Sequence, residues 1–164
     1  MLSESARASS AAELRYRIQA PNAQPRATAV FALDAAAADV LATLAQTSWG
    51  QATFLLAPAA DAPGADDGWV TDLRGRRSRV SDQVNAADQV LMLAGAGGGA
   101  EGAACVGRAC SRKRVMTTGL IVGAAGARER ELAKTLAQMR PWSLMLVVAG
   151  DDDYLADMMT ALRV

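Results

Sequence analysis

A cluster of glycines after an apolar run is the feature of this chain with the clearest potential for chemistry. The run "DQVLMLAG", residues 88–95, leads directly into "AGGGAEG", and the glycines of this stretch are Gly95, Gly97, Gly98, Gly99 and Gly102. Glycine permits positive φ, and it lacks the Cβ that would hold a phosphate away from backbone N–H groups. In a parallel sheet, such a turn between a strand and a helix lies at the carboxyl edge, where ligands bind. The segment therefore predicts an anion-binding turn.

A structural explanation of the same glycines stays open beside this one. Gly95, Gly97 and Ala100 fit the spacing G-x-G-x-x-G/A, but the pattern is weak and follows an internal strand rather than the first one. The glycines are not followed by the Lys-Ser/Thr pair of a Walker loop. Glu101 would place a carboxylate at the start of the next helix and repel a phosphate. These residues equally fit a tight turn against a closely packed helix.

The composition argues against several kinds of catalysis. The chain has no histidine, which disfavours zinc sites and His-based acid–base or triad chemistry. Its two cysteines, Cys105 and Cys110, would lie on different faces of a helix, a poor geometry for a disulfide or a shared metal. We therefore predict no catalytic residue and no metal ligand, and an enzyme is the less favoured class.

Charge and hydropathy limit the partners. Seventeen basic and seventeen acidic residues cancel, and the two arginine-rich stretches, residues 74–79 and 108–114, lack interleaved aromatic residues. Neither nucleic acid nor an anionic membrane is an expected partner. The sequence contains no apolar run of membrane-spanning length and no hydrophobic signal core at its start. The expected location is the cytoplasm, by default that of a prokaryote.

Apolar runs alternate with helical patterns along most of the chain. Expected strands cover residues 27–34, 51–58, 88–95, 115–123 and 142–150, with a further short one possible at 69–73. Expected helices cover residues 35–48, a segment from about 78 or 81, then 100–114, 127–139 and 151–164. Because the strands are continuously apolar, we predict an α/β fold: a three-layer Rossmann-like sandwich with a mostly parallel sheet of about five strands and helices on both faces. Residues 1–25 form an N-terminal arm, and residues 26–164 form a single domain.

The stretch "ADQVLMLAGAGGGAEGAACVGRA", continuing to "RVMTTGLIVG", resembles the nucleotide-binding domain of the tubulin/FtsZ family around its glycine signature. Ala87, Asp88, Val90 and Ala94 match together with the glycines at 95 and 97–99. The order of elements is similar from about residue 27 to residue 164, although only the glycine region is specific. This resemblance implies a Rossmann-like domain with GTP or GDP as the possible cofactor at the glycine turn.

The chain departs from that family at several nucleotide-contacting positions. The first family loop is rich in glycine, whereas here it reads "DAAAA" from Asp34 to Ala38. Ala100 and Glu101 replace the Thr and Gly of the signature, and Glu129 is the one match to the sugar-contacting stretch. The sequence also stops before the central helix and the acidic loop that hydrolysis requires. The resemblance therefore implies a divergent, truncated relative that has lost hydrolysis.

Two functions follow from these observations, and a third is weaker. The first is a non-catalytic module that acts through protein contacts, most simply as a homo-oligomer. The second is a binder of a nucleotide or another phosphorylated metabolite, with Gly95, Gly97, Gly98, Gly99, Ala100, Gly102, Asp34 and Glu129 as its candidate site residues. The third, an NAD-dependent or sugar-phosphate enzyme, lacks both a glycine fingerprint after the first strand and an obvious proton-transfer residue.

Overall fold

A seven-stranded sheet organises the computed structural model, which describes residues 25–57, 67–150, 154–162 and 164. The strand order is β4-β3-β2-β1-β5-β6-β7. The parallel strands are β1 (Thr28–Ala32), β2 (Ala52–Leu56), β5 (Gln89–Gly95), β6 (Met116–Val122) and β7 (Met145–Val148). The antiparallel hairpin of β3 (Trp69–Asp72) and β4 (Arg77–Arg79) extends the sheet beyond β2.

The predicted α/β class and mostly parallel sheet are confirmed, but the expected strand number was too low. The five long apolar strands are all present, and the difference is the β3–β4 hairpin at one edge. Its second strand has the sequence "RSR", which carries no apolar residue to mark it. This strand forms because the antiparallel pairing with β3 satisfies its backbone, not because its side chains favour burial.

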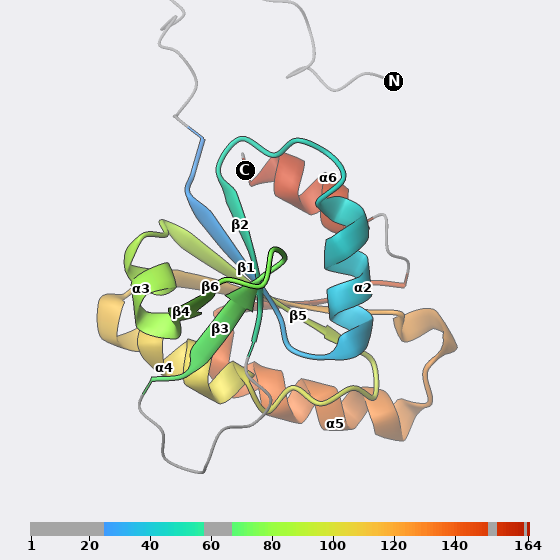
Figure 1. The fold of residues 1–164 in the computed structure, drawn as a ribbon. Coiled ribbons are helices and arrows are strands. Elements are labelled where there is room, and N and C mark those ends of the chain that lie inside the picture. The colour runs from blue at the N-terminus through green and yellow to red at the C-terminus, as the bar shows by residue number, and fades with distance from the viewer. Residues whose placement is uncertain (1–24, 58–66, 151–153, 163) are drawn as a thin grey trace, which may run out of the picture.

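Helices cover both faces of the sheet, as predicted for a three-layer sandwich. One face carries α2 (Ala35–Leu44) and α6 (Tyr154–Ala161), and the other carries α3 (Val80–Asn85), α4 (Ala103–Lys113) and α5 (Glu129–Met139) (Figure 1). Two short 3₁₀ turns, η2 (Ala124–Gly126) and η3 (Arg140–Trp142), complete the elements.

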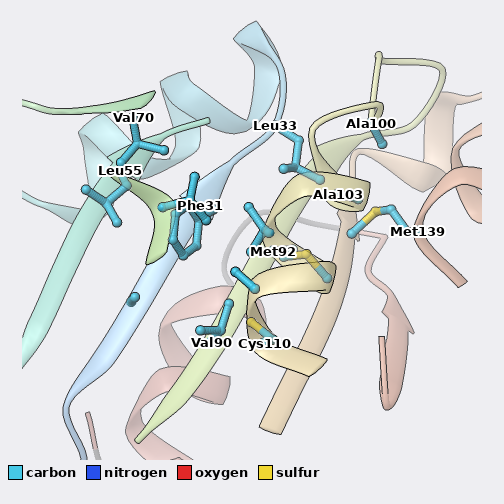
Figure 2. Close-up of a cluster of buried hydrophobic side chains, with 14 of the residues drawn as sticks. Phe31, Leu33, Leu55, Val70, Val90, Met92, Ala100, Ala103, Cys110 and Met139 are labelled. Atoms are coloured by element: carbon cyan, nitrogen blue, oxygen red, sulfur yellow. The ribbon is translucent and has the colours of Figure 1, made fainter. Parts of the chain in front are cut away.

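Small helix residues let the layers approach closely. In the core on the α4 side, Phe31 and Met92 of the sheet pack against Ala103 and Cys110 of the helix (Figure 2). A Cβ on Gly107 of α4 would lie 2.5 Å from the Cβ of Trp142, so this helix meets η3 without space for a side chain. Alanine and glycine thus supply close packing where the chain has few aromatic residues.

The order in which the chain adds strands to the sheet reverses between β1 and β5. From β1 the chain passes through α2 to β2 on one side, and later returns to place β5 on the other side of β1. Ala32 pairs with Leu93, so Asp34 and Gly95 each lie two residues beyond the same level of the sheet. This is the topological switch point, where open α/β sheets bind their ligands. The segment at Asp34 and the glycine turn therefore meet there.

The predicted N-terminal arm, residues 1–25, lies outside the described residues except for Pro25. The division of the chain into an arm and one domain stays a prediction.

Candidate functional site

Asp34 joins the end of β1 to the glycine turn after β5. It is the N-cap of α2, with extended backbone (φ −143°, ψ 178°), and its Oδ1 accepts a hydrogen bond from the Ala37 N–H at 2.8 Å. Its other oxygen, Oδ2, accepts from the Gly95 N–H at 2.8 Å. One carboxylate therefore accepts from the first turn of a helix and from the neighbouring strand end.

These two donors are of the kind that binds anions in other α/β proteins. N–H groups at a helix N-terminus and at a glycine turn attract negative charge, because they carry unpaired partial positive charges. Here the negative group that they bind belongs to the chain itself. A Cβ on Gly98 would overlap the Asp34 carboxylate, so the missing side chain at this position leaves room for Asp34.

The other side of the glycine turn packs against α5. Gly97, which has φ +84°, donates its N–H to Thr135 Oγ1 at 3.0 Å, and Thr135 is fully buried. A Cβ on Gly97 would approach the Cβ of Glu131 to 3.1 Å. Further along, the Ala100 N–H donates to Gln138 Oε1 at 3.0 Å. The turn thus lies between Asp34 on one side and one face of α5 on the other.

Most of the donors that a phosphate would need are already paired within the protein. Beyond the bonds of Gly95, Gly97 and Ala100, the Gly98 N–H donates to the Gly95 carbonyl at 3.0 Å. Each of these donors would have to exchange its protein acceptor for a ligand oxygen, which cancels most of the gain from a new hydrogen bond. The close backbone approach that glycine permits serves internal packing here.

A second carboxylate lies on the same turn. A Cβ on Gly99 would come within 2.6 Å of Glu101 Oε2, and Gln138 donates to the other Glu101 oxygen at 2.9 Å. The backbone N–H of Glu101 itself, the Gln138 amide and the charge of Lys134 lower the pKa of the Glu101 carboxyl. Glu101 is therefore ionised at neutral pH, and it adds to the negative charge of Asp34 around the turn.

The candidate residues differ in how far the fold brings them together. Asp34 and the glycines at 95 and 97–99 form one contiguous site, while Ala100 is buried and Gly102 is the buried N-cap of α4. Glu129 is the exposed first residue of α5.

The α5 residues with recorded contacts to the turn are Glu131, Thr135 and Gln138. The sequence reasoning missed Thr135 and Gln138. Their spacing from Glu131 puts all three on one face of a helix, which is the signal that could have identified them.

Cys110 does not supply a nucleophile. Burial raises the pKa of its thiol to about 12, and Cys105 is half-buried. In the described ranges, His, Cys, Asp and Glu side chains do not gather in groups of three or more that could hold a metal ion. Within the same ranges, none of the helices combines the length and apolarity that crossing a membrane requires.

Comparisons with known proteins find twelve matching chains among solved structures and no sequence relative. No protein-family model matches the chain. No curated protein matches it either. Among solved structures, the translation elongation factor SelB from Methanococcus maripaludis, crystallised in complex with the GTP analogue GppNHp, is similar, with a TM-score of 0.51 and 11% sequence identity. The alignment covers 87% of this chain but only 34% of SelB, and at this identity the likeness extends to the fold alone.

Proposed function

We propose that this chain is a non-catalytic Rossmann-like module that acts through contacts with other proteins or with itself. The observation that carries the proposal is the Asp34 carboxylate, which accepts from Ala37 and Gly95 at the switch point where a nucleotide phosphate would bind. A phosphate would have to displace Asp34 or lie beside it. Two negative groups so close repel each other in a partly buried site.

The cost of displacing Asp34 supports the same proposal. Losing an N-cap side chain destabilises a helix by about 0.5–2 kcal/mol. Moving the carboxylate away would also leave the Gly95 N–H to be satisfied by the incoming ligand. Glu101 stays ionised on the same turn, so the ligand would meet negative charge on two sides.

Self-association is part of this proposal, and the exposed edge of the sheet at β7 is its candidate surface. The edge strand and the residues flanking it carry no charge from Leu144 to Gly150, and Leu144, directly before β7, is 79% exposed. Met145 and Val148 are also exposed on this strand. Sheet edges in monomeric proteins are usually protected by charges or prolines, and the β4 edge has Arg77 and Arg79. A second copy of the chain, related by a twofold axis, would pair β7 with β7 and cover these side chains.

A divergent relationship to the tubulin/FtsZ domain is also part of the proposal. The two segments that this resemblance compares with nucleotide-contacting loops, those at Asp34 and at Gly95–Gly99, lie side by side at the switch point. In this interpretation the chain keeps the glycine turn, and its own carboxylate takes the place of an anionic ligand.

A second candidate function is binding of a nucleotide such as GTP or GDP, or of another phosphorylated metabolite. The glycine turn at the switch point favours it, and so does the fold that the chain shares with a SelB structure holding a GTP analogue. This function would require Asp34 to move out of the turn.

Thermal unfolding with GTP, GDP, ATP and NAD in the presence of Mg²⁺ separates the two candidates. A ligand at a hundredfold its dissociation constant adds about 2.7 kcal/mol to the free energy of unfolding. We expect none of the four to shift the midpoint of the natural chain.

The variant Asp34→Ser keeps a capping oxygen and removes the charge, so it tests the role of Asp34 directly. A shift that appears only with this variant would support the proposed role of Asp34. A shift with the natural chain would overturn the proposed function.

A further inference from the structure

The β3–β4 hairpin presents one face that no described helix covers. Val70 of β3 packs in the core on the α3 and α4 side, so Trp69 and Thr71 point to the opposite face of the sheet. There Trp69 pairs with Arg79, and Thr71 pairs with Arg77. On this side of the sheet, α2 packs over β1 and β2. Trp69 remains 43% exposed. On this face the hairpin thus extends the sheet past α2, while α3 and α4 lie on the opposite face.

Two arginines stack on Trp69. The guanidinium carbon of Arg79 lies 4.2 Å from the centre of the ring, and that of Arg77 lies 5.1 Å away. Arg79 also donates to the Asp67 carbonyl at 3.3 Å. Stacking orients the planar guanidinium groups and leaves in-plane N–H donors for a carboxylate. Because the side chains are already ordered, binding through them costs less conformational entropy.

A groove of about 450 Å³ lies at the turn end of the hairpin, between the end of α2, β2 and the turn residues Leu73 and Arg74. Ala52 and Phe54 pack with the core on the α2 side, so this part of the groove lies on the same face as Trp69. Asp72, which also lines the groove, pairs with Leu55 of the opposite core. Ala52, Phe54 and Leu73 supply apolar lining, and Arg74 and Arg76 also line it. Arg76 is paired with Asp72 at 2.7 Å. Among the described residues, the face therefore combines the two stacked arginines with a groove whose lining is partly apolar and partly charged.

We propose that this surface, formed by Trp69, Leu73, Arg77, Arg79 and the adjoining groove, binds an extended acidic segment of another protein. Carboxylates of the segment pair with the two stacked guanidinium groups, and one of its apolar side chains enters the groove. The inference rests on the proposed function, since it names the chemistry of one partner.

Tryptophan and arginine, the residue types of Trp69, Arg77 and Arg79, are among those that contribute most of the binding energy in protein interfaces. Nucleic acid fits the surface less well for two reasons. The Trp69 ring is already engaged by two cations rather than free to stack with a base. The chain as a whole carries no net positive charge.

Fluorescence anisotropy of the full chain tests the inference with a labelled peptide of alternating Glu and Leu, about eight residues long, so that its length matches a strand. We expect saturable binding, weakened about tenfold or more by Arg77→Glu with Arg79→Glu, because close interfacial charge pairs carry couplings of this size. The double substitution Arg77→Lys with Arg79→Lys keeps the charge but loses the planar guanidinium group, so it weakens binding less than the double Glu substitution.

The matched control is Arg130→Glu with Arg140→Glu, which alters two exposed arginines of α5 and η3. It leaves affinity within about twofold.

Three outcomes would overturn the inference: no saturable binding, an equal loss in the control variant, or tighter binding of an oligothymidine that the Glu variant abolishes. The last outcome would assign the surface to nucleic acid. Circular dichroism and thermal unfolding of each variant establish that it is folded. Thermal unfolding of the same samples with GTP tests the proposed function separately, so a failure of the hairpin surface is distinguished from a failure of that function.

Discussion

At the scale of single residues, the site depends on a pair of complementary positions. Asp34 supplies a carboxylate, and Gly98 supplies the space that this carboxylate occupies. Gly98 was a candidate because glycine lets a phosphate approach the backbone, and Asp34 was a candidate because the tubulin/FtsZ resemblance places it in the first nucleotide-contacting loop. Glycine removes the same obstacle for a neighbouring side chain. A list of residue types cannot separate these two uses, since the difference lies in which group fills the space.

The dependence between Asp34 and Gly98 is measurable by a double-mutant cycle. Gly98→Ala introduces a Cβ that overlaps the Asp34 carboxylate, and overpacking of this kind destabilises a fold by about 1–3 kcal/mol. Asp34→Ala removes the cap and the acceptor of Gly95, at a cost of about 1–3 kcal/mol. We expect Gly98→Ala to cost at least about 1 kcal/mol less in the Asp34→Ala background, measured by urea unfolding.

Gly50→Ala is the control for this cycle, because a Cβ at Gly50 meets nothing within 4 Å. Its effect on the free energy of unfolding stays within about 0.5 kcal/mol. Additive costs of the Asp34 and Gly98 substitutions would contradict the close contact of the two positions.

At the scale of elements, the hairpin turn depends on one aspartate. Asp72 Oδ1 accepts from the Arg74 and Arg76 backbone N–H groups at 2.8 and 2.9 Å, and Oδ2 accepts from Arg76 Nε at 2.7 Å. The Arg76 backbone N–H, followed by its side chain, lowers the pKa of the Asp72 carboxyl. The ionised carboxylate thus connects the end of β3 to the turn that precedes β4.

This arrangement predicts a pH-dependent contribution to stability. Because the pKa of Asp72 is lower in the folded chain, the carboxylate stabilises the fold above its unfolded pKa of about 3.9. The contribution is lost as the pH falls through the folded pKa. Asp72→Asn should lower the thermal midpoint at pH 7, and the difference from the natural chain should shrink as the pH falls below about 4. A difference that stays constant over this range would contradict an ionised role for Asp72.

The elements also differ in how well the sequence predicted them. β5 and β6 are buried along nearly their whole length and are rich in apolar residues, so both were expected. The three-residue strand β4 was not expected, because its partner β3 determines its structure. Thr135 of α5 looked like an ordinary helix residue, yet it accepts the Gly97 N–H from a segment 38 residues away. Long-range hydrogen bonds of this kind leave no local pattern in the sequence.

At the scale of the whole molecule, the two edges of the sheet differ. The β4 edge is short and carries arginines, whereas the β7 edge is apolar with exposed Met145 and Val148. Edges without charge favour pairing with another strand. This asymmetry predicts that self-association uses β7 and not β4.

Charged residues on β7 should therefore dissociate the oligomer. We expect Met145→Lys with Val148→Lys to reduce the mass measured by light scattering after size-exclusion chromatography to that of one 17.0 kDa chain. Leu73→Lys changes an exposed apolar residue of the opposite edge region and should leave the mass unchanged. A natural chain that is already monomeric at high concentration would contradict self-association, and an oligomer that survives the β7 change would contradict this surface.

The sequence by itself determined the α/β class, the apolar strands and the glycine turn at the end of β5. Residue type and spacing are enough to predict which segments are buried and where the backbone can turn. Only the tertiary structure decided what the turn contacts. Asp34 and Gly95 are 61 residues apart, and their hydrogen bond exists because β1 and β5 are neighbours in the sheet. Strand order depends on how all the layers pack together, so the identity of the group that fills the turn became visible only in the folded chain.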